Sequence, residues 1–301
     1  MYECTTEGKG HVNGLLVIDK PGGMTSRDAV NRVQGWFPRK TKLGHTGTLD
    51  PLATGVLVVC VGAATRLADY VQAMGKSYAS CFRLGATSTT DDADGDVTET
   101  LGVVPQTREQ IETALILLKG LIQQVPPAYS ALKLAGRRAH DLARQGKEVA
   151  LAARPVRIDA IRVTGFAWPW LDVEVDCGKG TYIRSIARDL GDRLGCGGLV
   201  QTLRRTRVGP FTVEQGLALD ADPASVKLRP MVDAVAGLAR RTLTADEVRR
   251  LRQGQRIAIT PEGCAPPPEA TEVSVLDESG ELVGICVVEG EQLKPHLVFA
   301  Q

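Results

Sequence analysis

Residues 44–57 of the sequence read GHTGTLDPLATGVL, and the apolar run continues as VVCVG to residue 62. A Val-rich run of this kind predicts a strand that is buried on both of its faces. Asp50 then lies on a glycine-containing loop at the start of a core strand, and such loops often carry catalytic side chains. An isolated Asp-Pro pair is more often an ordinary turn. Other motifs in the chain are therefore needed to choose between a catalytic aspartate and a turn residue at position 50.

Helical and strand patterns alternate along the chain. Thr25 with Asp28, and Thr107 with Gln110, form the capping patterns that open helices. Apolar or alternating runs predict strands at residues 14–19, 76–85, 155–166, 170–177, 199–211 and, as a hairpin, 273–288; further helices are expected at 65–73, from about 182, and at 244–254. Consecutive strand pairs favour an α+β fold over a doubly wound α/β fold. We expect a main domain, residues 1–230, and a smaller one, residues 231–301.

The composition excludes several classes of protein. Hydrophobic content of 43% and charged content of 24% are ordinary for a globular protein. The first residues lack the apolar core of a signal peptide and no run reaches membrane-spanning length, so a cytoplasmic location is expected. Seven cysteines without a CxxC pair argue against a disulfide framework and against a zinc site. The glycine-rich phosphate loops of nucleotide-binding proteins are also absent from the sequence.

Charge is segregated although the net charge is only +1. Residues 126–163 hold eight Lys or Arg against three acids, and residues 137–146 within them predict a short basic helix. Residues 87–100 hold five acids and no base, and their part from about Asp91 to Thr100 predicts a solvated loop. Residues 261–301 hold eight acids and one Lys. A basic segment can bind phosphates while the average stays neutral, but a solvated basic helix is equally consistent with this pattern.

Several motifs occur in one order along nearly the whole chain. They are GLLVIDKPGGMTS (14–26), the segment 44–57, KSYAS (76–80), DDADG (91–95), PPAYSALK (126–133), GTYIRS (180–185) and LRRTRVGPF (203–211). This set resembles the TruB-type tRNA pseudouridine synthases. The resemblance implies a catalytic domain with a central mixed, largely antiparallel sheet, followed by a small β-rich, PUA-like domain. The resemblance also implies a monomeric enzyme that converts uridine 55 in the T-arm of tRNA to pseudouridine. This enzyme would need no cofactor, no metal and no obligatory protein partner.

The implied reaction explains why a single carboxylate is wanted. Pseudouridine forms when the N1–C1′ bond of uridine breaks, the base turns, and C5 bonds to the same sugar. Hydrolytic glycosidases need two carboxylates, one for the leaving group and one to attack or to activate water. Here the leaving base is also the returning nucleophile, so one carboxylate suffices if water is kept out. Asp50 is the candidate for this carboxylate.

Other site residues come from the resemblance. The family pattern places the Arg184 guanidinium against Asp50, where it would keep a desolvated carboxylate charged. It places Tyr78 on the face of the uracil and Tyr182 near the aspartate. Leu203 matches a residue that lines the uracil pocket. On the residues alone, a surface arginine, two core tyrosines and a core leucine are the alternatives.

Four basic residues and two loop residues complete the expected substrate contacts. His45 matches a histidine that braces the RNA loop, and Lys20 is expected to hold either its own loop or a phosphate. Residues 126–154 correspond to a thumb-like insertion that closes on the T-arm. Its basic side chains suit phosphate contacts that position RNA without reading its sequence. The residues expected to make them are Arg137, Arg138, Arg144 and Lys147.

Three other functions remain in competition. A guide-RNA-dependent relative that modifies ribosomal RNA is disfavoured by the basic insertion, which the resemblance assigns to stand-alone enzymes. An RNA-binding or RNA-folding protein with an inactive pocket is disfavoured by the presence of Asp50, Tyr78, Tyr182 and Arg184. A metal-dependent nuclease built on DDADGD (91–96) lacks the trailing Glu of a calcium loop.

Overall fold

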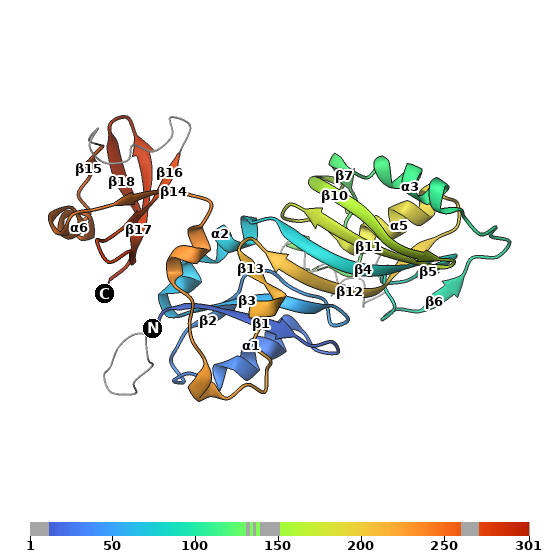
Figure 1. Ribbon diagram of the computed structural model, residues 1–301, viewed down its shortest axis with the longest axis horizontal. Helices are drawn as coiled ribbons and strands as arrows, with labels where there is room; N and C mark the ends of the chain where they lie inside the picture. Colours follow the sequence, from blue (N-terminus) through green and yellow to red (C-terminus); the bar gives the residue numbers. More distant parts are fainter. Residues whose placement is uncertain (1–11, 131–132, 135–136, 139–150, 260–270, 301) are drawn as a thin grey trace.

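A computed structural model of the chain describes residues 12–130, 133–134, 137–138, 151–259 and 271–300. A large sheet dominates the described residues, and a smaller sheet lies beside one end of it (Figure 1). The large sheet contains β1 (Gly14–Lys20), β2 (Leu43–His45), β3 (Thr54–Val61), β4 (Lys76–Leu84), β7 (Gly120–Gln124), β10 (Arg154–Ala167), β11 (Trp170–Cys177), β12 (Gly198–Val208) and β13 (Phe211–Thr212).

The strand order of the large sheet is β1-β3-β12-β4-β11-β10-β7, with β2 paired to β3 and β13 paired to β12. The strand β12 comes late in the chain and yet lies between two early strands. It pairs in parallel with β3 through Arg204 and Arg205, and the other pairings described in this sheet are antiparallel. The prediction of a mixed, largely antiparallel sheet is confirmed.

Helices cover both faces of this sheet. On one face lie α1 (Ser26–Gln34), α3 (Arg108–Ile116) and α5 (Ile183–Arg193); on the other lie η1 (Gly62–Leu67), α2 (Ala68–Ala73) and η4 (Met231–Val235). Alternate residues of β1 enter the two cores, since Leu16 and Ile18 join the first and Leu15 and Val17 the second. The same alternation buries β3 on both faces, as its Val-rich sequence predicts.

Local sequence signals locate the helix starts correctly. The Thr25–Asp28 and Thr107–Gln110 capping boxes form as expected at the starts of α1 and α3. The helix α3 ends at Ile116, and Gly120 begins β7. None of the helices within the described ranges is long and apolar enough to cross a membrane.

A second sheet with its own core forms the C-terminal part of the chain. It contains β14 (Ala239–Thr242), β15 (Ile257–Ala258), β16 (Glu272–Leu276), β17 (Leu282–Glu289) and β18 (Gln292–Val298), and α6 (Ala245–Arg252) packs on it. It docks on η1 and α2: Phe299 enters the core beneath them, and the Tyr70 hydroxyl donates to Glu272 at 2.9 Å. The α+β fold with a β-rich C-terminal domain is thus confirmed, while the boundary near Met231 stays a prediction.

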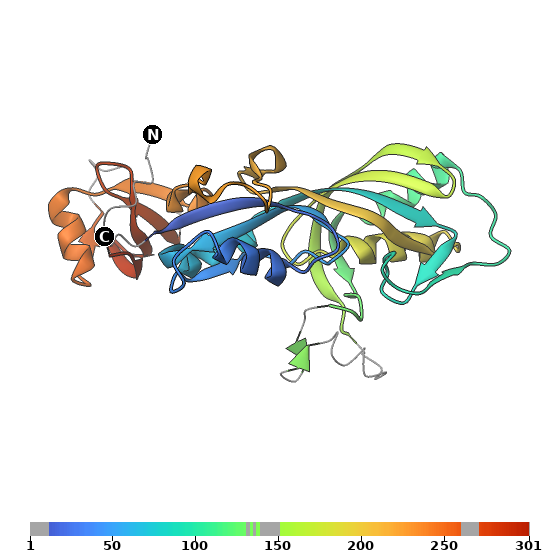
Figure 2. The same cartoon turned by 90° about the horizontal axis from the view of Figure 1, so that it is seen from below.

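Two local predictions need correction. The helix predicted at residues 137–146 does not include its first two residues, because β9 (Arg137–Arg138) pairs with β8 (Lys133–Leu134) in a short ribbon that projects from the large sheet (Figure 2). The rest of that predicted helix, residues 139–146, lies outside the described residues. Arg144 and Lys147 lie outside the described residues.

The acidic stretch is also not simply a solvated loop. Its ends form a hairpin of β5 (Ala86–Ser88) and β6 (Val97–Glu99), and Asp92 between them is buried. Asp92 can be buried because Thr90 and Arg184 meet its carboxylate. The remaining short elements, η2 (Val213–Gln215) and η3 (Pro223–Ser225), lie on the connection after β13.

Candidate active site

Lys20 and Ser26, at the end of β1 and the start of α1, make hydrogen bonds that hold the Asp50 loop. The Ser26 hydroxyl donates to the Leu49 carbonyl at 3.1 Å and accepts from the Leu49 amide at 2.8 Å. Lys20, fully buried, donates from Nζ to the carbonyls of Pro21 and Met24, each at 2.8 Å, and to that of Pro51 at 3.4 Å. Lys20 therefore ties its own loop, residues 21–24, to the residue that follows Asp50.

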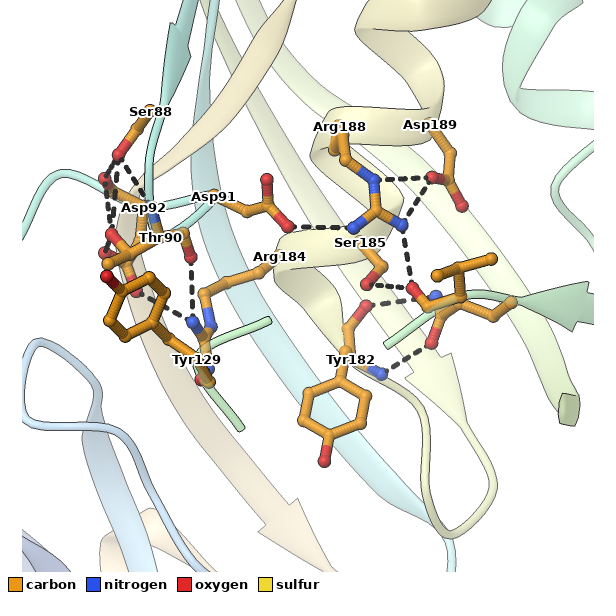
Figure 3. A network of polar contacts seen from close by, with 12 residues as sticks. Ser88, Thr90, Asp91, Asp92, Tyr129, Tyr182, Arg184, Ser185, Arg188 and Asp189 are labelled. Carbon is orange, nitrogen blue, oxygen red and sulfur yellow. Dashed lines mark hydrogen bonds and ion pairs between the residues drawn. The ribbon is translucent and has the colours of Figure 1, made fainter. Parts of the chain in front are cut away.

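Arg184 joins the loop to the acidic stretch. Its Nη2 lies 2.9 Å from Oδ2 of Asp50, and its Nη1 lies 3.5 Å from Oδ2 of Asp92. The same guanidinium donates to the carbonyls of Thr90 at 2.8 Å and Tyr129 at 3.0 Å (Figure 3). With only 4% of its side chain exposed, Arg184 is fixed at this junction and presents one edge to Asp50.

The charge on Asp50 is set by opposing neighbours. Burial raises the pKa of the Asp50 carboxyl above its ordinary value, Arg184 opposes this rise, and the negative charge of Asp92 adds to it. The side chain keeps 34% of its surface exposed toward the space in front of it. The group is thus a poorly hydrated carboxylate whose free edge can meet a ligand.

The start of α5 is fixed by the end of β7. The side chain of Gln124 accepts from the Tyr182 amide at 2.9 Å and donates to the Tyr182 carbonyl at 3.1 Å. Ser185 donates to the Val125 carbonyl at 2.9 Å, so the backbone on both sides of Arg184 is tied to one segment (Figure 3). The Tyr182 ring lies 5.0 Å from the Arg154 guanidinium, in a cation–π contact.

A cavity of about 290 Å³ opens in front of Asp50. It is near the lower end of the volumes found for small-molecule sites, which start at about 300 Å³. The residues around it come from the Asp50 loop, the end of α2, β4, β10, the start of α5, and β12. They are Gly47, Thr48, Leu49, Asp50, Gln72, Lys76, Tyr78, Arg154, Gly180, Thr181, Tyr182, Ile183, Arg184, Leu203 and Arg205.

The structure brings five of the expected residues together at this cavity: Asp50, Tyr78, Tyr182, Arg184 and Leu203. His45 is not among the residues that line it. It lies on β2, opposite Val59, and its buried Nδ1 has no hydrogen-bond partner within the described part of the chain. Burial and the positive charges of Arg27 and Arg205 lower the pKa of His45, so its imidazole is neutral at physiological pH.

Sequence reasoning missed three residues of the site. Arg205 and Lys76 line the cavity, and Asp92 lies behind Arg184. Arg205 could have been found, because it follows Leu203 by two residues on a strand and must share its face. Lys76 likewise precedes Tyr78 by two residues on β4. Nothing in the local sequence distinguishes Asp92 from the other acids around it.

Within the described residues no group of three or more His, Cys, Asp or Glu side chains could hold a metal ion. The five cysteines that the structure describes are free thiols.

Comparison with known proteins decides the family. Residues 36–183 match the model of the TruB family pseudouridylate synthase N-terminal domain, and residues 184–235 match that of the tRNA pseudouridylate synthase B C-terminal domain. A protein of Mycobacterium sp. (strain KMS) named tRNA pseudouridine synthase B is 45% identical over 294 residues, which cover 93% of this chain and 97% of that protein. The chain belongs to the TruB family.

Two further relatives extend the comparison for this TruB-family chain. A tRNA pseudouridine synthase B of Paenarthrobacter aurescens (strain TC1) is 42% identical over 299 residues, which cover 96% of each protein. Among solved structures, a chain in the crystal structure of a Cbf5-Nop10-Gar1 complex superposes with a TM-score of 0.72 at 25% identity and covers 95% of this chain and 85% of that one. The large mixed sheet is thus that of a pseudouridine synthase.

Proposed function

We propose that this TruB-family chain isomerises uridine 55 in the T-arm of tRNA to pseudouridine, with Asp50 as the nucleophile. The observation that carries the proposal is the Asp50 carboxylate, held by Arg184 at 2.9 Å in the wall of a cavity that Tyr78, Tyr182 and Leu203 also line. The names of the relatives support tRNA as the substrate. A uridine inside a folded RNA loop has to leave its stack to reach such a cavity.

The cavity supplies what the reaction requires. Asp50 can attack C1′ of the bound uridine as the N1–C1′ bond breaks, and Arg184 favours the charged form of the carboxylate. The freed base then turns, C5 bonds to C1′ as the bond between Asp50 and C1′ breaks, the C5 proton leaves, and N1 takes up a proton, so the reaction is redox-neutral. Tyr78 and Leu203 lie where a base would be held, and enclosure by protein keeps water from the sugar carbon.

Tyr182 lines the same cavity. In the proposal its hydroxyl assists proton movement at C5, and Arg154 over its ring limits the directions in which the side chain can turn. His45 lies near the cavity but not in its wall, so a contact with the displaced RNA loop suits it better than a contact with the base. Lys20 acts through the loop that it supports.

The basic insertion is proposed to hold the RNA. Arg137, Arg138, Arg144 and Lys147 are assigned phosphate contacts with the T-arm, and β8 and β9 show that its first part projects from the sheet (Figure 2). The C-terminal domain is proposed to be PUA-like. The proposal includes no cofactor, no metal and no obligatory protein partner, and it treats the chain as a cytoplasmic monomer.

One assay tests the function directly. Purified protein is incubated with an unmodified tRNA transcript, and pseudouridine is mapped by nucleotide. We expect conversion at position 55, and none in a transcript that carries cytidine there. Tight tRNA binding without pseudouridine would instead support an RNA-binding protein with an inactive pocket, and conversion only in the presence of a guide RNA would support the guided relative.

A further inference from the structure

We propose that Arg205 is a positioning residue of this site, which holds the backbone before Asp50 in place and fixes the side chain of Tyr78. The inference rests on the proposed function, because it assigns Arg205 a part in the same reaction. Arg205 lies on β12, only 2% exposed, and its guanidinium reaches the cavity wall.

The contacts of Arg205 converge on the Asp50 loop. Its Nε donates to the Val56 carbonyl at 2.7 Å, and its Nη2 donates to the Gly47 carbonyl at 3.0 Å. A longer contact of 3.5 Å runs from Nη1 to the Thr48 carbonyl. One planar group therefore ties the chain before Asp50 to the strand after it. A guanidinium can do this because its donors point in fixed directions, whereas an ammonium has no such fork.

Strand register places Arg205 against Tyr78 as well. Arg205 lies opposite Tyr78 on β4 and beside Gly55 on β3. The Tyr78 side chain is buried, which raises its pKa, and the nearby Arg205 guanidinium opposes that rise. Arg205 thus contacts the loop that carries Asp50 and lies opposite Tyr78, whose ring is expected to meet the base.

The surroundings of Arg205 argue against a role in an ordinary ion pair. Within the described part of the chain its guanidinium donates to three backbone carbonyls, and no carboxylate forms an ion pair with it. Arg204, one residue earlier, instead pairs with Asp19 at 2.7 and 3.0 Å and does not line the cavity. The two neighbours differ in role because adjacent strand residues point to opposite faces.

The test compares Arg205→Gln and Arg205→Lys with Arg204→Gln as the matched control. Turnover at saturating tRNA, tRNA affinity and amide hydrogen exchange are measured for each variant. For Arg205→Gln we expect kcat to fall about a hundredfold while affinity stays within about threefold, because a loop displaced by about 1 Å misplaces the nucleophile. Exchange at residues 47–50 should quicken without a similar change in α3.

The lysine variant separates geometry from charge. Arg205→Lys keeps the charge but loses the fork, so it should restore little of the turnover, and Arg204→Gln should behave as wild type. Full activity in Arg205→Lys, or a loss of affinity with kcat intact, would overturn the proposal. Failure of both Arg205 variants to fold would overturn it too, since it would assign Arg205 to the stability of the sheet. A wild-type protein that makes no pseudouridine would count against the proposed function, and the exchange comparison would still show whether Arg205 holds the loop.

Discussion

Burial of Asp50 raises the pKa of its carboxyl, and Arg184 and Asp92 change that pKa in opposite directions. The cation lies 2.9 Å away and favours the carboxylate, while the second anion lies behind the cation and disfavours it. Because Arg184 is shared between two carboxylates, it cannot neutralise either completely. The result is an aspartate whose pKa lies above that of a free aspartate, with Arg184 opposing the rise.

Replacing Asp50 by Asn should abolish isomerisation and leave tRNA binding within about tenfold of wild type. The amide is nearly isosteric but cannot act as a nucleophile, so turnover should fall by at least about a thousandfold. Single-turnover assays and a binding titration measure the two effects separately. Residual turnover above a few per cent of wild type would remove Asp50 from the nucleophile role.

The pH dependence should respond to the neighbours of Asp50. Protonated Asp50 cannot attack, so the rate should fall as the pH drops through its pKa, which burial places above the ordinary 3.8. Arg184→Gln removes the charge that lowers this pKa and should move the acid limb of kcat to higher pH. Asp92→Asn removes a charge that raises it and should move the limb to lower pH. Identical acid limbs in both variants and wild type would mean that another group limits the rate.

At the scale of elements, the contact between β3 and β12 aligns the site. Gly55 has a φ of +98°, and a β-carbon on it would overlap the carbonyl oxygen of Arg205. The backbones approach so closely that only glycine fits there. This contact places Leu203 and Arg205 beside the loop that ends at β3, and it explains the glycine of the ATGVL segment.

Gly55→Ala should therefore destabilise the protein by about 3 kcal/mol or more, which combines backbone strain with steric overlap. Gly102→Ala is the matched control, since Gly102 also has a positive φ, +72°, but no atom lies within 4 Å of the added carbon. Strain alone should cost about 1 kcal/mol there. Chemical denaturation of both variants gives the comparison. Equal losses would show that β12 can move away from β3 at little cost.

The sequence predicted elements well where the information is local. Capping boxes marked α1 and α3. The family resemblance carried by the ordered motifs, rather than any one local signal, supplied five of the residues that line one cavity. Arg205 could have been predicted from the two-residue period of a strand, since it follows Leu203 by two residues on β12. The burial of Asp92 could not be predicted, because it depends on Arg184, a partner 92 residues further along the chain. The insertion of β12 between β3 and β4 is equally non-local.

On the scale of the whole molecule, charge is distributed unevenly along the chain. Residues 126–163 carry eight bases, while the last 41 residues carry eight acids. The acidic part includes β16, β17 and β18 of the second sheet, which docks on η1 and α2 rather than on the strands around the cavity. We therefore expect the strongest phosphate contacts to come from the basic insertion, and the C-terminal domain to contribute less.

A variant with Ala at Arg137, Arg138, Arg144 and Lys147 tests this expectation. Its tRNA affinity should fall, and the plot of log affinity against log salt should become less steep by about 0.7 to 0.9 for each phosphate that is no longer bound. Turnover at saturating tRNA should change less than affinity, since none of the four is expected to touch the base. An unchanged salt slope would mean that the insertion is a solvated part of the scaffold.

The strand order has a consequence for how the protein is made. The strands β3 and β4 are close in the chain, but they cannot pair, since β12 occupies the place between them. On the ribosome, β3 and β4 are synthesised long before β12. Until β12 is available, the backbone hydrogen-bonding groups on one edge of each strand have no partner strand. Only when residues 198–208 emerge can one sheet form from the two halves. The nascent chain is therefore most exposed to aggregation and to chaperones in this interval, and the reaction site, which spans both halves, cannot form before β12 has been synthesised.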